Sequence, residues 1–181
     1  MKKLKMLTPV LVLAVICIVV TGALAATYQV TDPIIKAAQA AAAEAARAQV
    51  LPEGTGFTDI TADYADELPE CVTAVYSTEN NAGYVMSLSN QGYGGPITLM
   101  IGIKADGTIS AIQVLDASGE TPSVGVAALN RESFYSQFPG KDSSLEGVET
   151  VTSATITTSA YIEAVRDAFT AFDLITGKEG A

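Results

Sequence analysis

The stretch Glu149-Thr-Val-Thr-Ser-Ala-Thr155-Ile-Thr-Thr-Ser159 stands directly before an apolar pattern of helical spacing. The apolar positions of that pattern are Ile162, Val165, Phe169 and Phe172. Thr158 or Ser159 is suited to cap the helix, so Thr155 is expected just upstream of the helix N-terminus. A helix N-terminus has unpaired N–H groups and about half a positive charge, and it favours a phosphate. The stretch therefore predicts a helix whose first turn lies beside a hydroxyl group and binds phosphate.

The Thr-rich composition of this stretch has a simpler interpretation. A run of hydroxyl residues before a helix is typical of a loop that ends in a cap. From the pattern alone, this interpretation stays open beside the functional one.

The segment upstream of this stretch has the composition of β-strands. Four runs rich in Val, Ile, Tyr and Thr predict strands, at 71–77, 83–89, 97–104 and 109–116. Glu79-Asn-Asn-Ala-Gly83 predicts the turn between the first two strands, and Ala105-Asp-Gly107 predicts a hairpin between the last two. Residues 57–69 are acidic and predict irregular structure, whereas 127–138 predict a helix. The fold class is therefore α+β, with a twisted, mostly antiparallel sheet covered by helices.

The N-terminus predicts a membrane helix at residues 1–26. Lys2, Lys3 and Lys5 precede Met6–Ala26, a run of 21 uncharged residues, and about 20 such residues span a bilayer. Basic residues before the span place the N-terminus in the cytoplasm and the rest outside. A cleaved signal peptide is the alternative, because Ala23-Leu-Ala25 resembles a cleavage site. Residues 27–51 are rich in Ala and predict a juxtamembrane helix, so the folded domain is expected at 52–181.

Charge and side-chain chemistry exclude several classes of protein. Beyond residue 26 the chain has seven basic and twenty acidic side chains, a net charge of −13, and such a surface repels nucleic acid. The sequence contains no histidine, so Ser–His or Cys–His catalysis cannot be built within it, and no catalytic or metal-binding residue is predicted. Cys17 lies in the predicted span and Cys71 outside it, so no internal disulfide is expected.

The run Glu149-x-x-Thr152-Ser153-Ala154-Thr155 resembles the flavin-attachment motif of the FMN-binding domain family. In that family, a flavin transferase joins FMN through a phosphoester to the last Thr of an acidic-x-x-[Ser/Thr]-Gly-Ala-Thr segment. The resemblance implies that Thr155 carries FMN covalently. Ser153 departs from the usual Gly, which has free access to positive φ, although this departure leaves the acceptor hydroxyl in place.

Two further segments resemble the same family in the same order. Gly92-Tyr-Gly-Gly-Pro-Ile97 is similar to the family's Gly-Tyr-Gly-Gly-Pro-Ile segment, and Glu120-Thr-Pro-Ser-Val-Gly125 is similar to its Glu-Thr-Pro-Gly-Leu-Gly loop. Each glycine cluster taken alone is typical of a turn. The resemblance implies a set of flavin contacts: Glu120, Thr121, Val124, Gly125, Ile156, Thr157 and Thr158.

Within the family, the chain is most similar to the G subunit of the Rnf complex, a membrane assembly that couples electron transfer between ferredoxin and NAD to ion movement. The implied partners are the other membrane subunits and a flavin transferase. The implied role is that of an electron carrier rather than an enzyme alone. Three alternatives stay open: the C subunit of a sodium-pumping NADH:quinone reductase, a stand-alone extracytoplasmic flavoprotein, and a flavin-free membrane scaffold.

Overall fold

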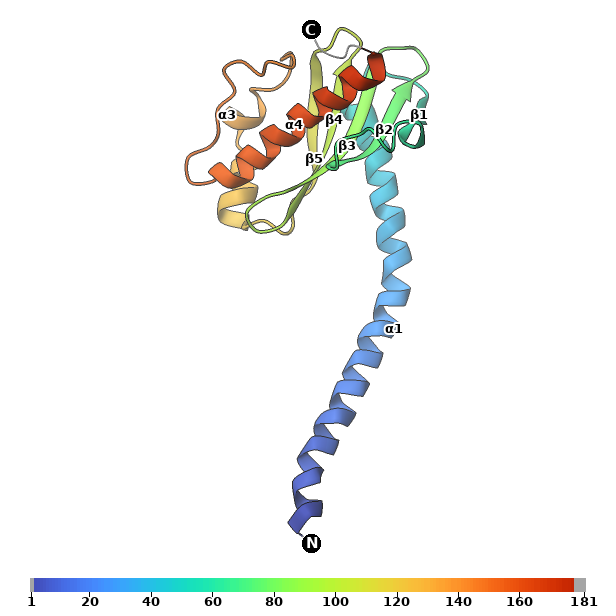
Figure 1. Cartoon of the computed structure of the whole chain (residues 1–181), viewed down its shortest axis with the longest axis vertical. Coiled ribbons are helices and arrows are strands. Elements are labelled where there is room, and N and C mark those ends of the chain that lie inside the picture. The colour runs from blue at the N-terminus through green and yellow to red at the C-terminus, as the bar shows by residue number, and fades with distance from the viewer. Residues whose placement is uncertain (1, 178–181) are drawn as a thin grey trace. The chain divides into compact units, whose positions relative to one another are not determined.

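The computed structural model describes the backbone of residues 2–177 and the side chains of residues 12–33, 35, 41–43 and 45–177. The chain forms two compact units, Met1–Ala42 and Ala43–Ala181. Each unit is described by itself below (Figure 1).

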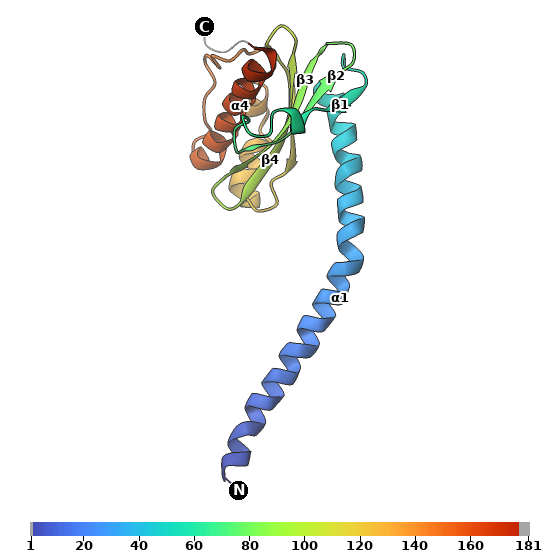
Figure 2. The same ribbon diagram turned by 45° about the vertical axis from the view of Figure 1, so that its right-hand side comes forward.

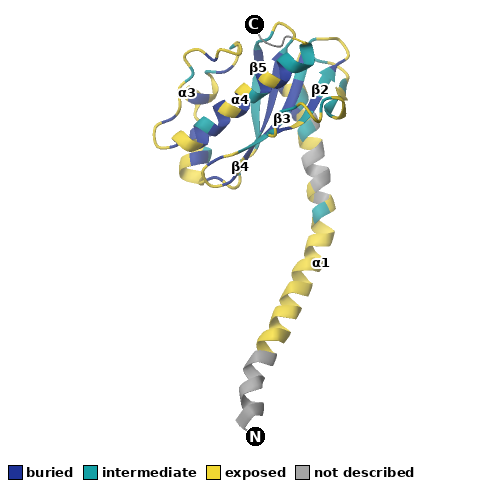
Figure 3. Ribbon diagram, viewed as in Figure 1, coloured by how far each residue is buried: buried dark blue, intermediate teal, exposed yellow. Residues whose placement is uncertain are grey.

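The first unit is helical throughout its described length. It belongs to α1 (Lys2–Val50), so the predicted span and the predicted juxtamembrane helix form one continuous helix. Among the described residues, one stretch is long and apolar enough to cross a membrane, Val12–Pro33 with 22 residues. At 1.5 Å per residue it is roughly 33 Å long, close to the thickness of a bilayer core. Its side chains are exposed except that of Asp32, which is partly buried (Figure 3). The side chains of the three N-terminal lysines, and of all other residues before Val12, lie outside the described ones, whereas the backbone is described from Lys2.

The second unit is built on an open five-stranded sheet in which every neighbouring pair is antiparallel. Its strands follow one another in chain order as a meander (Figures 1 and 2). They are β1 (Phe57–Asp59), β2 (Val72–Thr78), β3 (Gly83–Gln91), β4 (Pro96–Lys104) and β5 (Ile109–Asp116). The four predicted strands are confirmed to within two residues at each end, as is the α+β class.

Both predicted turns are confirmed. Between β2 and β3, the Thr78 hydroxyl donates to the Gly83 carbonyl at 2.9 Å, and Asn81 takes a positive φ of 51°. Between β4 and β5, Gly107 takes a φ of 85° and its N–H donates to the Lys104 carbonyl at 2.9 Å. A left-handed residue in each turn lets the chain reverse direction within a few residues.

The prediction of irregular structure for residues 57–69 is wrong at its start. Residues 57–59 form the edge strand β1, paired to β2 with Phe57 opposite Thr78, and Thr61–Asp63 form a 3₁₀ turn. The Asp59 carboxylate accepts from the Thr61 hydroxyl at 2.6 Å and from its backbone N–H at 2.9 Å. A three-residue strand is too short to show an alternating pattern, so the sequence contains no signal for it.

Helix α4 (Thr155–Thr176) covers one face of the sheet (Figures 1 and 3). Its predicted apolar positions are confirmed as buried: Ile162, Val165, Phe169 and Phe172. They pack against β3 and β4 side chains that include Met86, Leu88, Leu99 and Ile101. The helix ends at Gly177, which adopts the left-handed conformation typical of a C-terminal cap.

The predicted N-cap of this helix is wrong. The helix begins at Thr155, with Ala154 as its N-cap residue, rather than after Thr158 or Ser159. The Thr158 hydroxyl donates to the Ala154 carbonyl at 2.9 Å and accepts from the Val151 N–H at 3.2 Å. The Thr158 backbone N–H also donates to the Ala154 carbonyl at 2.9 Å, so Thr158 lies inside the helix and the helix starts about one turn earlier than expected.

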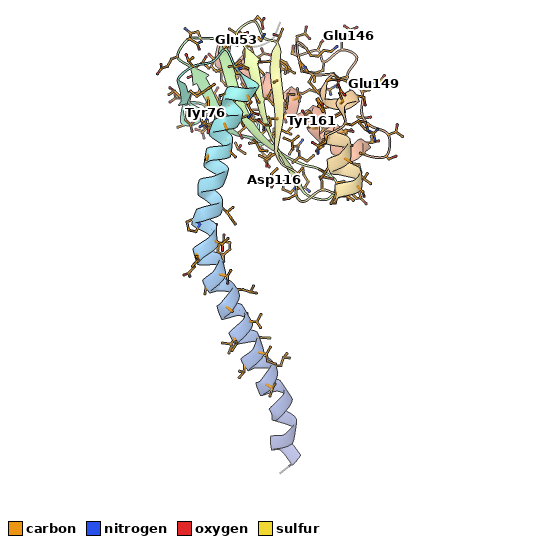
Figure 4. All side chains as sticks on the ribbon, turned by 180° about the vertical axis from the view of Figure 1, so that it is seen from behind. Glu53, Tyr76, Asp116, Glu146, Glu149 and Tyr161 are labelled. Carbon is orange, nitrogen blue, oxygen red and sulfur yellow. The ribbon has the colours of Figure 1, made fainter. Side chains whose placement is uncertain are left out.

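The opposite face of the sheet is covered by the last turns of α1 that belong to the second unit. Ala46, Val50 and Leu51 pack there with Val85 of β3 and Met100 of β4. The Arg47 guanidinium lies 4.3 Å from the ring centre of Tyr76, which lies beside these turns (Figure 4). A Cβ on Gly102 would collide with the Val50 carbonyl oxygen, so glycine is what lets the helix end approach β4.

The single helix predicted over 127–138 is wrong. The segment after β5 contains a π-helical turn (Pro122–Val126), α2 (Ala127–Leu129) and α3 (Glu132–Tyr135). Arg131 is extended, with φ −76° and ψ 125°, and this conformation interrupts the helix. The two phenylalanines of the segment are both buried against Tyr161, with ring centres 5.2 Å (Phe134) and 5.0 Å (Phe138) away. Packing of these rings onto α4 favours two short helices over one.

Candidate functional site

A pocket of about 440 Å³ lies at the N-terminal end of α4. Three separate segments supply its walls: the β3–β4 loop, the segment that follows β5, and the first turn of α4 with the residues before it. Figure 1 shows that these segments meet at one end of the sheet. The lining residues are Tyr93, Glu120, Thr121, Val124, Gly125, Ser153, Ala154, Thr155, Ile156 and Thr157. The volume lies in the range of pockets that bind small molecules and cofactors.

Glycines allow the first two walls to touch through their backbones. A Cβ on Gly94 would lie 2.5 Å from the Gly119 carbonyl oxygen, and a Cβ on Gly95 would lie 2.8 Å from the Gly119 Cα. Both distances are too short for a side chain. The Gly92 N–H donates to the Gly95 carbonyl at 2.9 Å and closes the turn. The predicted glycine turn therefore also acts as a packing surface.

Glu120 joins all three walls. It is buried, with 3 % of its surface exposed. One carboxylate oxygen accepts from the Gly94 N–H at 3.1 Å, and the other accepts from the Thr157 hydroxyl at 2.9 Å. A Cβ on Gly92 or on Gly125 would collide with this carboxylate. The two glycines thus make room for the carboxylate, and its hydrogen bonds hold the walls together.

The start of α4 is shaped by a left-handed residue. Ser153 has a φ of 77°, a conformation that glycine adopts without steric cost. The Ala154 N–H donates to the Val151 carbonyl at 3.0 Å, and the helix begins with the next residue. Thr155 is the first helical residue and its side chain is exposed. The first N–H groups of a helix have no acceptor within it, so this hydroxyl lies beside N–H groups that can bind an anion.

Three large apolar side chains are exposed at the mouth of the pocket. Tyr93, Val124 and Ile156 have 71 %, 42 % and 58 % of their surface exposed. The second unit exposes one other large apolar side chain among its described residues, Tyr135. An exposed apolar patch beside a cavity with polar groups is typical of a binding site.

The structure brings most of the predicted flavin contacts together. Six of the seven line the pocket: Glu120, Thr121, Val124, Gly125, Ile156 and Thr157. Thr158 is fully buried, and its hydroxyl bonds into the preceding turn instead. Of the predicted motif residues, Ser153, Ala154 and Thr155 also line the pocket.

Glu149 and Thr152 do not belong to the pocket lining, and both are exposed. The Glu149 backbone is held by the Gln137 side chain, which accepts from the Glu149 N–H at 2.8 Å, and Glu149 lies beside α3 (Figure 4). An exposed position leaves both side chains accessible to another protein.

Sequence reasoning missed Tyr93 as a site residue. The signal that could have found it is an aromatic residue with a glycine on each side, because flexible glycines at a turn expose the ring between them. Cys71, by contrast, lies outside the pocket. Its burial, and then its hydrogen bond to Asp167 at 3.0 Å, raise the pKa of its thiol to about 12, which disfavours the reactive thiolate.

Two family models match the chain. The FMN-binding domain matches residues 92–170, a range that contains every lining residue of the pocket. The RnfG N-terminal region matches residues 1–50.

Curated relatives are similar over most of their length. A protein of Methanosarcina acetivorans, named as the G subunit of an ion-translocating oxidoreductase complex, is 33 % identical over 97 % of this chain and 98 % of its own. The G subunit of the Na⁺-translocating ferredoxin:NAD⁺ oxidoreductase complex of Acetobacterium woodii is 29 % identical over 86 % of each chain. The proton-translocating counterpart of Clostridium ljungdahlii is 26 % identical over 91 % of this chain and 90 % of its own.

Proposed function

We propose a function from two premises: this chain belongs to the G-subunit family of ion-translocating oxidoreductase complexes, and its pocket fits a flavin. The chain is a membrane electron-transfer subunit with an FMN-binding domain. More specifically, it is part of an Rnf-type ferredoxin:NAD oxidoreductase and carries FMN joined covalently to Thr155. When bound, FMN supplies the capacity to accept and release electrons, which the side chains of this protein lack.

The residues of the pocket fit the two halves of FMN. The apolar side chains of Tyr93, Val124 and Ile156 suit a flat aromatic ring, and the aromatic side chain of Tyr93 supports stacking on it. The first turn of α4 suits the phosphate, because its N–H groups and its dipole favour an anion. The Thr121 side chain is exposed on the pocket wall and can hydrogen-bond the polar edge of the ring.

The position of Thr155 is the observation that carries the proposal. Its hydroxyl is exposed as the first residue of α4 and also lines the pocket. A phosphoester there keeps the phosphate at the helix N-terminus while the ring lies in the pocket. In the attachment, the Thr155 oxygen would form a bond to the flavin phosphate as the phosphoanhydride bond of an activated flavin donor breaks. The other phosphate of the donor would leave with the bonding electrons, and the hydroxyl proton would pass to the solvent.

A flavin transferase is the partner that this chemistry requires. Four residues in and around the turn at Ser153 are exposed to solvent: Glu149, Thr152, Ser153 and Thr155. This exposure supports recognition of the motif Glu149–Thr155 by a separate enzyme, because an approaching active site can reach the hydroxyl without unfolding α4.

The N-terminal charges support an orientation in the membrane. Three lysines precede the apolar stretch, so the N-terminus is proposed to be cytoplasmic and the FMN domain extracytoplasmic. The single helix provides a contact surface for other membrane subunits of the complex. Relatives are named for sodium and for protons, so the translocated ion does not follow from membership in this family.

The test is an intact-mass measurement of the full chain, purified in detergent after co-expression with a flavin transferase. The wild type is expected to gain the mass of one FMN on the peptide that contains Thr155. Thr155→Val is expected to fold without flavin. Thr150→Val, an exposed threonine in the same loop, is the matched control and keeps the flavin. Flavin that stays on denatured Thr155→Val protein would refute the assignment.

A further inference from the structure

Glu120 is unusual among the acidic residues of this protein. Of the charged side chains whose burial the structure describes, Glu120 alone is buried. The other carboxylates of the second unit whose burial the structure describes are at least partly exposed to solvent. Burial of a charge opposes folding unless hydrogen bonds or an opposite charge compensate it. The charge of Glu120 is therefore a feature that needs a physical reason.

The contacts of Glu120 compensate its charge only in part. Its two oxygens accept one backbone N–H, from Gly94, and one neutral hydroxyl, from Thr157. Within the described residues, it has no ion pair with a lysine or an arginine. Thr157 is in the first turn of α4, so the positive end of the helix dipole adds to this stabilisation.

The geometry of these contacts does not require a charge. A glutamine of the same length can accept from the Gly94 N–H with its amide oxygen and can donate its amide N–H to the Thr157 hydroxyl oxygen. The walls of the pocket would then be joined as they are now. What a neutral side chain would remove is the negative charge beside the ring that the pocket is proposed to hold.

We propose that Glu120 is a positioning residue that lowers the midpoint potential of the flavin through its buried charge. This inference rests on the proposed function, because it places the flavin ring in the pocket that Glu120 lines. Each electron that enters the ring from the donor leaves it for the acceptor. Between these two events, the ring carries one more negative charge unless a proton from solvent accompanies the electron. A carboxylate in a poorly solvated wall repels that added charge and favours the oxidised flavin.

The experiment compares midpoint potentials of the flavinylated full chain in detergent by spectroelectrochemical titration. Glu120→Gln is expected to shift the equilibrium at least tenfold toward the reduced flavin, which is about 59 mV for a one-electron couple. Glu120→Met, also neutral and of similar length, is expected to shift it in the same direction. If one of the two neutral variants does not fold, the other still tests the proposal.

Three controls separate charge from shape. Glu163→Gln removes an exposed charge from α4 and is expected to leave the potential unchanged. Glu120→Asp and Thr157→Ser keep the charge of residue 120, and Thr157→Ser also keeps the hydroxyl that donates to it. Both variants alter the packing around the carboxylate, and both are expected to keep a low potential. A shift in these two variants as large as that of Glu120→Gln would overturn the proposal, because geometry would then explain it.

A wild-type potential in fully flavinylated Glu120→Gln would also overturn it. Absence of covalent flavin from the wild type itself would refute the proposed function instead. The two failures are therefore distinguished by whether the wild-type protein carries FMN.

Discussion

Two regions of this chain expose large apolar side chains, and they do so in different ways. In α1, exposed apolar residues follow one another along the helix from Val12 to Ile35. At the pocket mouth, three exposed side chains come from three separate segments and surround a cavity with polar groups in its wall. Among the other described residues of the second unit, Tyr135 is the one further exposed large apolar side chain, and the buried ones are packed between the sheet and its helices.

The difference indicates two kinds of binding partner. A long apolar surface on a single helix matches the hydrocarbon core of a bilayer, which needs no specific contact. A small apolar rim around a buried carboxylate and a helix N-terminus matches one molecule with an aromatic ring and an anionic group. Exposure of apolar residues thus supports membrane attachment in the first region and a cofactor in the second.

The strongest test of this comparison places a lysine in each region. Ile18→Lys puts a charge in the span, where Lys is roughly 3 kcal/mol less favourable than Ile, and is expected to reduce membrane insertion. Ile156→Lys at the pocket mouth is expected to change the free energy of unfolding by about 0.5 kcal/mol or less, because its side chain is exposed. Carbonate extraction measures the first effect and thermal denaturation the second. Unchanged membrane retention of Ile18→Lys would contradict a role of this stretch as a lipid-facing span.

Two glycines test whether the end of α1 packs against the sheet while its apolar stretch does not. Gly102→Ala is expected to destabilise the second unit by about 1–3 kcal/mol, because the new methyl group meets the Val50 carbonyl where α1 ends. Gly22→Ala is the control, since nothing lies within 4 Å of its added methyl group. Calorimetry of the full chain in detergent measures both. Equal stability of the two variants would mean that the end of α1 does not pack on the sheet.

Four strands of the sheet were predictable from the sequence because each is long enough for its high content of Val, Ile, Tyr and Thr to stand out. β2 to β5 have at least seven residues each, and glycine-containing turns separate them. β1 has three residues and depends on pairing with β2, which no local pattern reveals. The interruption at Arg131 likewise follows from the packing of Phe134 and Phe138 on Tyr161, a contact between distant parts of the sequence.

The site was predictable in part for a similar reason. Motif resemblance indicated the residues of the pocket but not their roles in it. Nothing local distinguishes Thr157, which points to Glu120, from Thr158, which bonds back to the preceding turn. That difference depends on where α4 begins, and Ser153 determines this start through its left-handed conformation.

Tyr93 at the pocket mouth tests whether the exposed apolar side chains there contact a flavin ring. If Tyr93 stacks on the flavin, Tyr93→Leu is expected to weaken contact with the ring by about 0.5–1.5 kcal/mol and to increase flavin fluorescence, which a stacked tyrosine quenches. Tyr135→Leu is the control, because Tyr135 is also exposed but does not line the pocket. Steady-state fluorescence and its lifetime are measured on protein with equal flavin content. Equal brightness of the two variants would exclude stacking by Tyr93.

The smallest effect is expected at Ser153, whose backbone conformation supports the pocket mouth but whose side chain is not one of its three exposed apolar ones. Ser153→Gly is expected to stabilise the second unit by up to about 1 kcal/mol, since glycine adopts a φ of 77° without strain and keeps the rim unchanged. Gly140→Ser is the reverse control at a φ of 79°, where an added Cβ meets nothing within 4 Å, and it is expected to destabilise by about 1 kcal/mol.

Melting temperatures of the unflavinylated chains measure both changes. Opposite shifts would show that Ser153 retains backbone strain at the start of α4, beside the hydroxyl proposed to carry FMN. A destabilised Ser153→Gly would mean instead that the serine side chain supports the turn. In that case the Ser153 side chain would both line the pocket and hold the turn before α4 in place. A substitution at residue 153 would then change the pocket mouth and the backbone together.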